Sequence, residues 1–243
     1  MLKFFYRGYK KASYYLKRRQ LPWRLKLLKY FLPAFLHNPQ QSLKLLGKIS
    51  KGQLDFYNLY LIIFGPTVLK DIFDACQKVN IQPFLLWGTL LGCIREGRFI
   101  QHDNDVDLGL LKDDYLKKDL FIEDMCKKGY CVSQDNNFLL AFYHSKRESP
   151  ALCIHSVYEK KGQIAISDQV KERTQVQTHY FSASIFKRFI KVKFEGMDVL
   201  IPAQAEKFVE AAYGADWRIP KSEWDHLGDC LNPTFDKVIE VSK

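Results

Sequence analysis

The sequence predicts a mixed α/β (α+β) domain preceded by a basic, helical N-terminal arm. Segments with helical periodicity and short apolar, strand-like runs follow one another along residues 55–243. Hydrophobic residues make up 47% of the 243 residues, enough for a sizeable core. Residues 1–54 contain 13 Lys and Arg and no Asp or Glu, whereas the rest has 24 basic and 27 acidic residues. We therefore divide the chain into an arm, 1–54, and a globular domain, 55–243.

The arm has the composition of a helix that lies on a membrane surface. Apolar residues from Phe5 to Leu16 recur at helical spacing among basic residues, and Pro22 and Pro33 divide the arm into short helices. Aromatic rings suit the headgroup boundary, and each Lys or Arg near anionic lipid adds about 1 kcal/mol. We predict that residues 1–36 bind an anionic membrane surface. The alternatives are an arm that packs on the domain or is solvated, and a nucleic-acid contact, which we favour least.

The chain shows none of the patterns of a secreted or membrane-spanning protein. No early apolar run has the form of a secretory signal. The most apolar stretch, "LYLIIFG" from Leu59, is far shorter than the ~20 residues that span a bilayer. None of the six cysteines forms a C-x-x-C pair, which argues against a zinc ribbon. We expect a cytoplasmic protein with free thiols, peripheral on the inner face of a bacterial membrane.

The first half of the domain alternates helices and strands. After Gly65-Pro66, "TVLKDIFDACQKVNI" has one apolar face and predicts a helix with Thr67 as its N-cap. "FLLW" predicts a buried strand, and "GTLLGCIREG" predicts a turn and a helix that ends at Gly97. "DVDLGLL" predicts the next strand. "DDYLKKDLFIEDMCKKG" predicts one surface helix, with acidic residues early and lysines late.

The second half is predicted to be mostly strands. Apolar and alternating runs occur in "YCVSQ", "NFLLAFYHS", "ALCIHSVYEKKGQIAIS" and "TQVQTHYF". "FIKVKFEGMDVLIP" predicts a hairpin that turns at Glu195-Gly196, and "AQAEKFVEAAYG" predicts a helix that ends at Gly214.

The acidic cluster "HDNDVDLGLL" contains the strongest candidates for chemistry. Strand alternation places Asp105 and Asp107 on one face and turns Val106 and Leu108 inward. Two adjacent carboxylates can bind Mg²⁺ and leave its other positions to water and phosphate, as phosphoryl or nucleotidyl transfer requires. The spacing alone also describes a solvated acidic loop. An EF-hand is excluded, because Leu108 stands where that loop requires glycine.

A phosphate-binding turn precedes this cluster. Gly88 and Thr89 open the predicted helix after a strand, where backbone N–H groups and a hydroxyl are available to a phosphate. A strand, a Gly-Thr helix start and an Asp-x-Asp strand in this order resemble the nucleotidyltransferase fold. We therefore expect a mixed sheet flanked by helices.

The resemblance is more specific than the fold. "FLLWGTLLGCIREGRFIQHDNDVDLGLL" resembles the signature of the LicD/fukutin family, which includes phosphocholine and ribitol-phosphate transferases. "LIPAQAEKFVEAAYGADWRIP" is similar to the closing segment of that family. The resemblance covers roughly residues 60–220 and leaves the basic arm outside.

This resemblance implies a transferase that uses Mg²⁺, or alternatively Mn²⁺. It implies that Asp105 and Asp107 hold the metal, with Asp103 as a further ligand or neighbouring acid. It implies a CDP-linked donor of choline phosphate or alditol phosphate, and a glycan hydroxyl as the acceptor. The donor phosphates would be bound by Gly88, Thr89, Arg95 and Arg98.

The sequence also departs from the family pattern. Gln101-His102 replaces the usual Pro-Trp, and the family's third carboxylate is missing from its later strand. Either Cys153 or His155 falls at that point, and His155 is our candidate for the general base. Asp168 is a further candidate. Two alternatives therefore stay open, namely a nucleotidyltransferase that releases pyrophosphate from an NTP and a degenerate, non-catalytic member.

Overall fold

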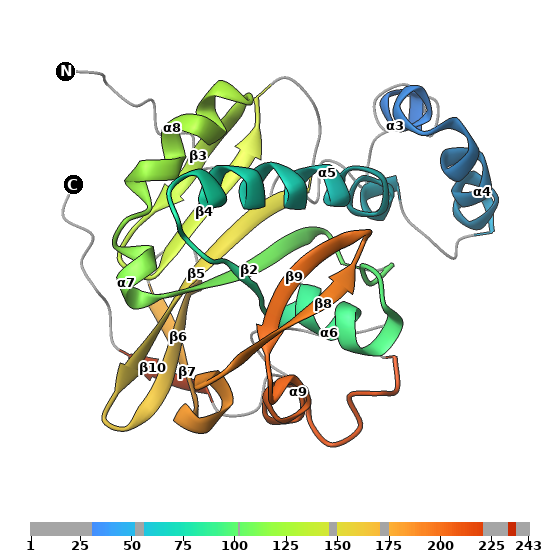
Figure 1. Ribbon diagram of the computed structural model, residues 1–243. Coiled ribbons are helices and arrows are strands. Elements are labelled where there is room, and N and C mark those ends of the chain that lie inside the picture. Colours follow the sequence, from blue (N-terminus) through green and yellow to red (C-terminus); the bar gives the residue numbers. More distant parts are fainter. Residues whose placement is uncertain are drawn as a thin grey trace.

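The structure, a computed structural model, describes residues 31–51, 56–101, 103–145, 150–170, 175–220 and 233–236. It confirms the predicted α/β (α+β) class, because a mixed sheet is covered by helices (Figure 1). Residues 1–30, most of the predicted membrane-binding arm, lie outside the described residues.

In the part of the chain that the structure describes, the sheet contains ten strands in a mixed arrangement. The main path runs β10-β7-β6-β5-β2-β1-β9-β8, and β4 joins it by pairing with both β3 and β5. Strand β2 lies parallel to β5 and antiparallel to β1. The strands are β1 (Phe84–Leu85), β2 (Asp105–Leu111), β3 (Tyr130–Asp135), β4 (Leu139–His144), β5 (Ala151–Lys160), β6 (Gln163–Val170), β7 (Gln175–Ser182), β8 (Phe189–Phe194), β9 (Met197–Pro202) and β10 (Pro233–Asp236).

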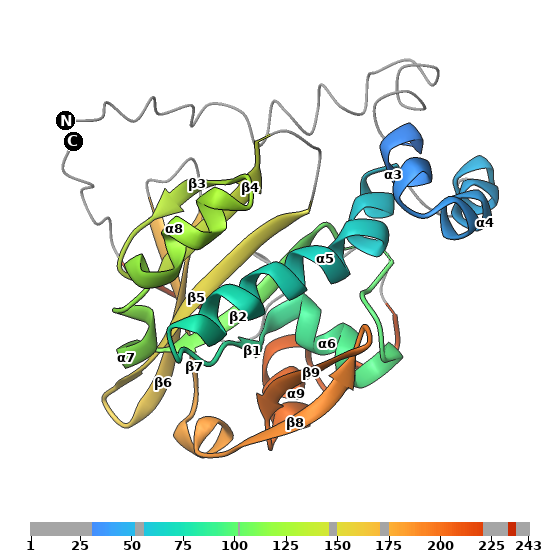
Figure 2. The same cartoon turned by 45° about the horizontal axis from the view of Figure 1, so that its top comes forward.

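Helices cover both faces of the sheet. Helix α5 (Phe56–Lys78) and helix α8 (Asp119–Lys127) lie over β2, β5 and β3 (Figure 2), where the Tyr130 hydroxyl on β3 bonds Asp71 of α5 at 2.9 Å. Helix α6 (Trp87–Glu96) and helix α9 (Ala205–Tyr213) lie on the other side. Two short helices lie in connections: α7 (Lys112–Tyr115) between β2 and α8, and the 3-10 helix η2 (Ala183–Phe186) between β7 and β8.

Two predicted helices differ from the observed ones. Thr67 is not an N-cap, because α5 begins at Phe56 and runs through Pro66. An interior proline costs about 3 kcal/mol or more, but apolar residues on both sides of it are buried and hold the helix together. The single surface helix predicted over residues 113–129 is instead two helices, α7 and α8, separated by residues 116–118.

The strand and turn predictions near the acidic cluster are largely confirmed. Strand β2 has the predicted bounds, and α6 ends at Gly97, whose φ of 66° is left-handed. The hairpin turns at Glu195-Gly196, both with positive φ. The strand expected over "FLLW" covers only Phe84–Leu85, because Trp87 already begins α6.

Helices α3 (Leu32–His37) and α4 (Pro39–Ser50) lie beside the domain and pack on the first half of α5 (Figure 1). They share a small apolar cluster with α5 that includes Ala34, Leu45 and Phe64. The predicted arm–domain boundary at residue 54 falls in residues 52–55, outside the described residues. Among the described helices, none is both long and apolar enough to cross a bilayer.

Candidate functional site

Strand β2 presents its acidic residues on one face. Val106 and Leu108 are fully buried, whereas Asp105 and Asp107, which alternate with them, are half-buried. The predicted alternation is therefore confirmed. Its apolar positions belong to the main core, and both α5 and α6 contact the strand.

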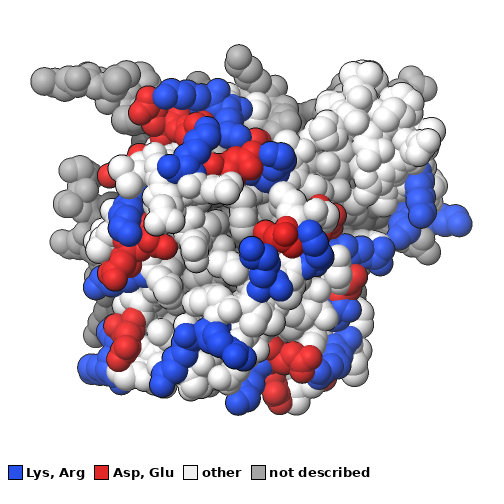
Figure 3. Space-filling view, in the orientation of Figure 1, with Lys and Arg blue, Asp and Glu red and all other residues white. Residues whose placement is uncertain are grey.

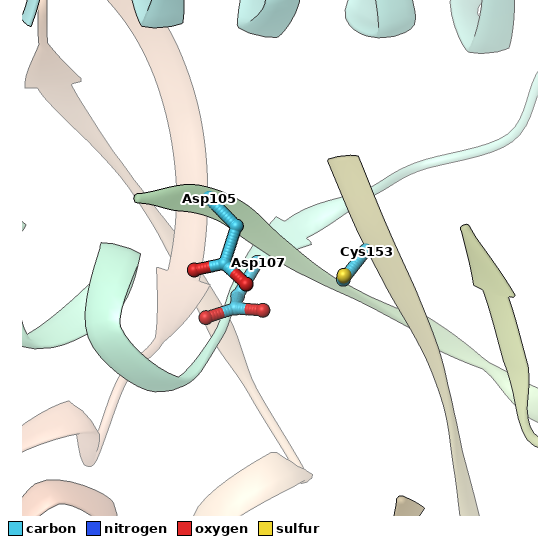
Figure 4. Close-up of side chains that lie close together, drawn as sticks. All are labelled: Asp105, Asp107 and Cys153. Atoms are coloured by element: carbon cyan, nitrogen blue, oxygen red, sulfur yellow. The ribbon is translucent and has the colours of Figure 1, made fainter. Parts of the chain in front are cut away.

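The register of β2 and β5 adds a thiol to the two carboxylates. Asp107 is directly opposite Cys153 in the parallel pairing. One oxygen each of Asp105 and Asp107 and the sulfur of Cys153 all lie within 4.8 Å of one another. Figure 4 shows the two carboxylates side by side, with the thiol of Cys153 directed toward them from the neighbouring strand.

The first turn of α6 fixes the backbone of Asp107. Its N–H donates a hydrogen bond to the Thr89 hydroxyl at 2.9 Å, and its carbonyl accepts one from the Leu86 N–H at 3.2 Å. Thr89 is 1% exposed, so this contact is inside the protein. Thr89 therefore positions a candidate metal ligand, and its predicted role in phosphate binding stays a prediction.

Asp103 lies against the same turn. A Cβ atom on Gly88 would lie 2.3 Å from Asp103 Oδ2, so only glycine leaves room for this carboxylate. The Asn58 side chain on α5 donates a hydrogen bond to the Asp103 carbonyl at 3.0 Å, and the Asn104 N–H donates to Asp103 Oδ1 at 2.9 Å. The three predicted acids thus converge on the start of α6.

The crowding of these carboxylates changes how Asp103 titrates. Burial raises the pKa of Asp103 from its ordinary 3.8 to about 6, and the charge of Asp107 acts in the same direction. Hydrogen bonds with the Asp105 side chain and with the backbone of Asn104 and Asp105 oppose the rise in the pKa of Asp103 only in part. The cluster therefore concentrates negative charge that a bound cation would stabilise.

His155 lies behind this cluster. It follows Cys153 by two residues on β5, opposite Gly109, and is 2% exposed. Its Nε2 atom is 3.6 Å from Asp107 Oδ1. Burial by itself lowers the pKa of His155, but the contact with Asp107 and the charge of Asp168 on β6 outweigh burial and raise the pKa above its usual 6.5. The predicted base therefore contacts a candidate metal ligand, and its role stays a prediction.

The two predicted phosphate-binding arginines both contact Glu96. The Arg95 guanidinium is 11% exposed, lies 2.8 Å from Glu96 Oε1 and donates to the Trp217 carbonyl at 3.4 Å. Arg98 is 61% exposed, with its Nε atom 3.7 Å from Glu96 Oε2. Arg95 thus ties α6 to the segment after α9, while Arg98 remains accessible to solvent. Phosphate binding by either residue stays a prediction.

The structure adds two points that the sequence left undecided or missed. Cys153 and His155 were both candidates for the third position, and the pairing of β2 with β5 places Cys153 opposite Asp107. Asn58 was missed, because it lies 45 residues before Asp103 and only the packing of α5 brings it there.

The donor set fits a divalent cation. Two carboxylates are the ligands that Mg²⁺ and Mn²⁺ accept most readily. The thiol is a softer donor than the oxygen ligands that Mg²⁺ prefers. Asp105 and Asp107 would therefore hold the ion, with Cys153 beside it.

Known proteins resemble this chain mainly over the region that contains the site. The family model of the LicD/FKTN/FKRP nucleotidyltransferase domain matches residues 80–204. An uncharacterised protein of Rickettsia prowazekii is 25% identical over 166 residues, which cover 68% of this chain and 57% of that protein. Human ribitol-5-phosphate transferase FKTN is 27% identical over 155 residues, which cover 61% of this chain and 32% of FKTN. The chain thus matches about a third of the length of FKTN.

Among solved structures, the crystal structure of ANT(2'')-Ia in complex with adenylyl-2''-tobramycin is 14% identical, with a TM-score of 0.41, over 66% of this chain and 81% of that one. The family match spans β1, α6 and β2 through β9, and it includes Gly88, Thr89, the three acids and Cys153. The chain therefore belongs to the LicD/FKTN/FKRP nucleotidyltransferase-domain family.

Proposed function

We propose that this protein is a divalent-cation-dependent transferase that moves a phospho-substituent from a CDP-linked donor to a hydroxyl of a glycan. The observation that carries the proposal is the pair of carboxylates, Asp105 and Asp107, held beside Cys153 at the start of α6. Membership of the family supports a phospho-substituent transferase. FKTN is a ribitol-5-phosphate transferase, which supports an alditol phosphate as the transferred group, with choline phosphate as the alternative.

The residues of the site have distinct parts in this mechanism. A bound Mg²⁺ or Mn²⁺ would neutralise charge on the donor diphosphate and on the departing CMP. Asp105 and Asp107 would hold the cation. The N–H groups of the first turn of α6 and the accessible guanidinium of Arg98 bind phosphate oxygens. His155 is buried behind the cluster and holds Asp107 in place through the contact of its Nε2 atom, and the proton that the acceptor hydroxyl loses passes to water.

The test is release of CMP from CDP-ribitol, CDP-glycerol and CDP-choline by the full chain with Mg²⁺ or Mn²⁺. Asp105→Asn should reduce release by at least about 10³-fold, because the phosphoryl transfer depends on charge stabilisation. Asp113→Asn, which changes an exposed acid on α7, is the matched control and should leave release unchanged. Equal turnover by Asp105→Asn and the unmodified protein would reject the assignment.

A second candidate function is that of a nucleotidyltransferase that releases pyrophosphate from an NTP, which the match to a nucleotidyltransferase domain supports. The leaving group separates the two activities, since CMP indicates the CDP donor and pyrophosphate indicates an NTP.

A third candidate is a non-catalytic family member, for which the replacement of the third carboxylate by Cys153 is the motivating observation. Calorimetry that detects no binding of Mg²⁺, Mn²⁺ or a cytidine nucleotide would favour the non-catalytic reading.

We also propose that the N-terminal segment binds the anionic inner surface of a membrane, where a glycan acceptor would be presented to a cytoplasmic enzyme. In the described part of residues 1–36, Leu32 is 45% exposed and Leu36 is 73% exposed. Just beyond this segment, Leu43 on α4 is 56% exposed. Figure 3 shows a face over α3 and α4 with few charged side chains and basic residues at its edge. Exposed leucines beside lysines are typical of an interfacial helix.

Pelleting with liposomes that contain phosphatidylserine tests the membrane proposal. Leu36→Glu should lower the bound fraction, and Leu120→Glu, at a 57% exposed leucine on α8, should not. Retention on RNA that exceeds retention on the liposomes would instead support the nucleic-acid alternative.

A further inference from the structure

The third side chain of the cation site is a thiol whose position is fixed from two sides. Cys153 is opposite Asp107 of β2 and, across its other edge, opposite Ala141 of β4. It is 7% exposed and packs with Leu139 and Ala141 in a small apolar cluster. Because both neighbouring strands fix the backbone, the β-carbon of residue 153 must point to the same face as the carboxylates.

This geometry makes Cys153 more than a small apolar residue of the core. Its sulfur lies within 4.8 Å of a carboxylate oxygen of both Asp105 and Asp107, and Figure 4 shows it directed toward them. A buried cysteine that only fills space needs no such neighbours. An ion that bridges the two carboxylates would therefore meet the sulfur as its next protein donor.

A thiol at this position changes which ion the site prefers. Mg²⁺ requires oxygen donors and near-ideal octahedral geometry, so sulfur adds little to its binding. Zn²⁺ and Co²⁺ accept thiolate together with carboxylate, and the thiol gives up its proton when it coordinates them. A carboxylate at residue 153 would instead add a third oxygen ligand and a third negative charge.

We propose that Cys153 is a cation ligand that turns the site into a mixed carboxylate–thiolate centre and shifts its selectivity from Mg²⁺ toward thiophilic divalent cations. The inference rests on the proposed function for the existence of a cation site. It goes further in naming the ligand and the class of ion.

The direct test is absorption spectroscopy of the full chain titrated with Co²⁺. Coordination by Cys153 produces a sulfur-to-cobalt charge-transfer band in the near ultraviolet, which Cys153→Ser removes. Cys126→Ser, at an exposed thiol on α8, is the matched control and should keep the band. Because the charge-transfer band is measured on the unmodified protein, this part of the test does not depend on the folding of any variant. Bound Co²⁺ without a charge-transfer band would overturn the inference.

Calorimetry of the same proteins measures the change in selectivity. Loss of an outer partner of a metal ligand typically lowers affinity 10–100-fold, so loss of a ligand in Cys153→Ser should weaken Zn²⁺ binding at least about tenfold. Its effect on Mg²⁺ should be much smaller, and Cys153→Asp should strengthen Mg²⁺ binding. Equal changes for both ions would overturn the inference, and circular dichroism confirms that each variant is folded.

The failure of this inference can be told apart from that of the proposed function. If a cation binds through Asp105 and Asp107 without coordination by Cys153, only the proposal of a thiolate ligand is rejected. A protein that shows the charge-transfer band but releases no CMP from any CDP-linked donor keeps the thiolate centre and loses the proposed function. Binding of no divalent cation would overturn both.

Discussion

The two faces of strand β2 have opposite physical character. On one face, Val106, Leu108 and Leu110 are fully buried in the main core. On the other face, Asp105 and Asp107 place two carboxylates beside each other, with Asp103 just before the strand. One seven-residue strand thus supplies both the apolar anchor and the charged site.

This difference explains how one strand holds like charges close together. Burial of each large apolar side chain stabilises the fold by about 1.5–3 kcal/mol, which fixes the strand whatever its other face carries. The hydrogen bonds from Asp107 N–H to Thr89 and from Leu86 N–H to the Asp107 carbonyl then fix its backbone. The acidic face is therefore expected to reduce stability and provide function, whereas the apolar face provides stability.

The largest expected effect is on the apolar face. Leu108→Ala should lower the free energy of unfolding by about 2–5 kcal/mol, because it leaves a cavity at a fully buried position. Urea denaturation followed by circular dichroism measures this loss. Ile190→Ala, at a 41% exposed position on β8, should change the free energy by less than about 0.5 kcal/mol and serves as the control. A loss below 1 kcal/mol at Leu108, of the order that surface positions show, would contradict the comparison.

The acidic face should make the cation-free protein less stable as the pH rises. The folded protein holds a proton on Asp103 up to a pKa of about 6, whereas the unfolded chain loses it near 3.8. Asp103 thus stabilises the fold at low pH, and this contribution is lost as the pH rises through about 6, by at most roughly 3 kcal/mol. The raised pKa of His155 acts in the same direction above its ordinary value of 6.5.

Thermal melts from about pH 4 to pH 8 in the presence of a chelator measure this dependence. The difference between the unmodified protein and Asp103→Asn isolates the contribution of Asp103. Should Asp103→Asn show the same pH dependence as the unmodified protein, another group carries it.

Loss of the hydrogen bond between Thr89 of α6 and Asp107 of β2 should have an intermediate effect on stability. Thr89→Val should lower the free energy of unfolding by about 1–3 kcal/mol, because the buried N–H of Asp107 loses its acceptor. Thr89→Ser keeps the hydroxyl and should retain most of the stability. Denaturation of both variants is the measurement, and a larger loss in Thr89→Ser than in Thr89→Val, which keeps a methyl group, would indicate that Thr89 contributes through its methyl group.

The smallest effect on the cation-free protein is expected at the metal-facing acid itself. Asp107→Asn should change the free energy of unfolding by less than about 1 kcal/mol, because relief of the repulsion with Asp103 offsets the loss of the contact with His155. The same variant should lose the stabilisation that a cation gives at saturation, about 2.7 kcal/mol at a hundred times its Kd. Thermal melts with and without Mn²⁺ measure both, and retained stabilisation by Mn²⁺ would contradict the ligand role.

Short-range patterns were sufficient for much of the fold around the site. The alternation of "DVDLGLL" predicted the bounds of β2 and the faces of its residues. Glycines predicted the end of α6 at Gly97 and the turn at Glu195-Gly196. Local rules failed at Pro66, where α5 continues because packing against α3, α4 and the sheet stabilises the helix on both sides of the proline.

The sequence by itself determined that Asp105 and Asp107 share one face of a strand, because the two-residue period of a strand depends only on neighbours in the chain. Only the tertiary structure decided that Cys153 rather than His155 is opposite Asp107, that Thr89 holds the backbone of Asp107, and that Asn58 reaches Asp103. Strand register and helix packing join residues 18 to 46 positions apart in the chain, and no local pattern specifies such contacts.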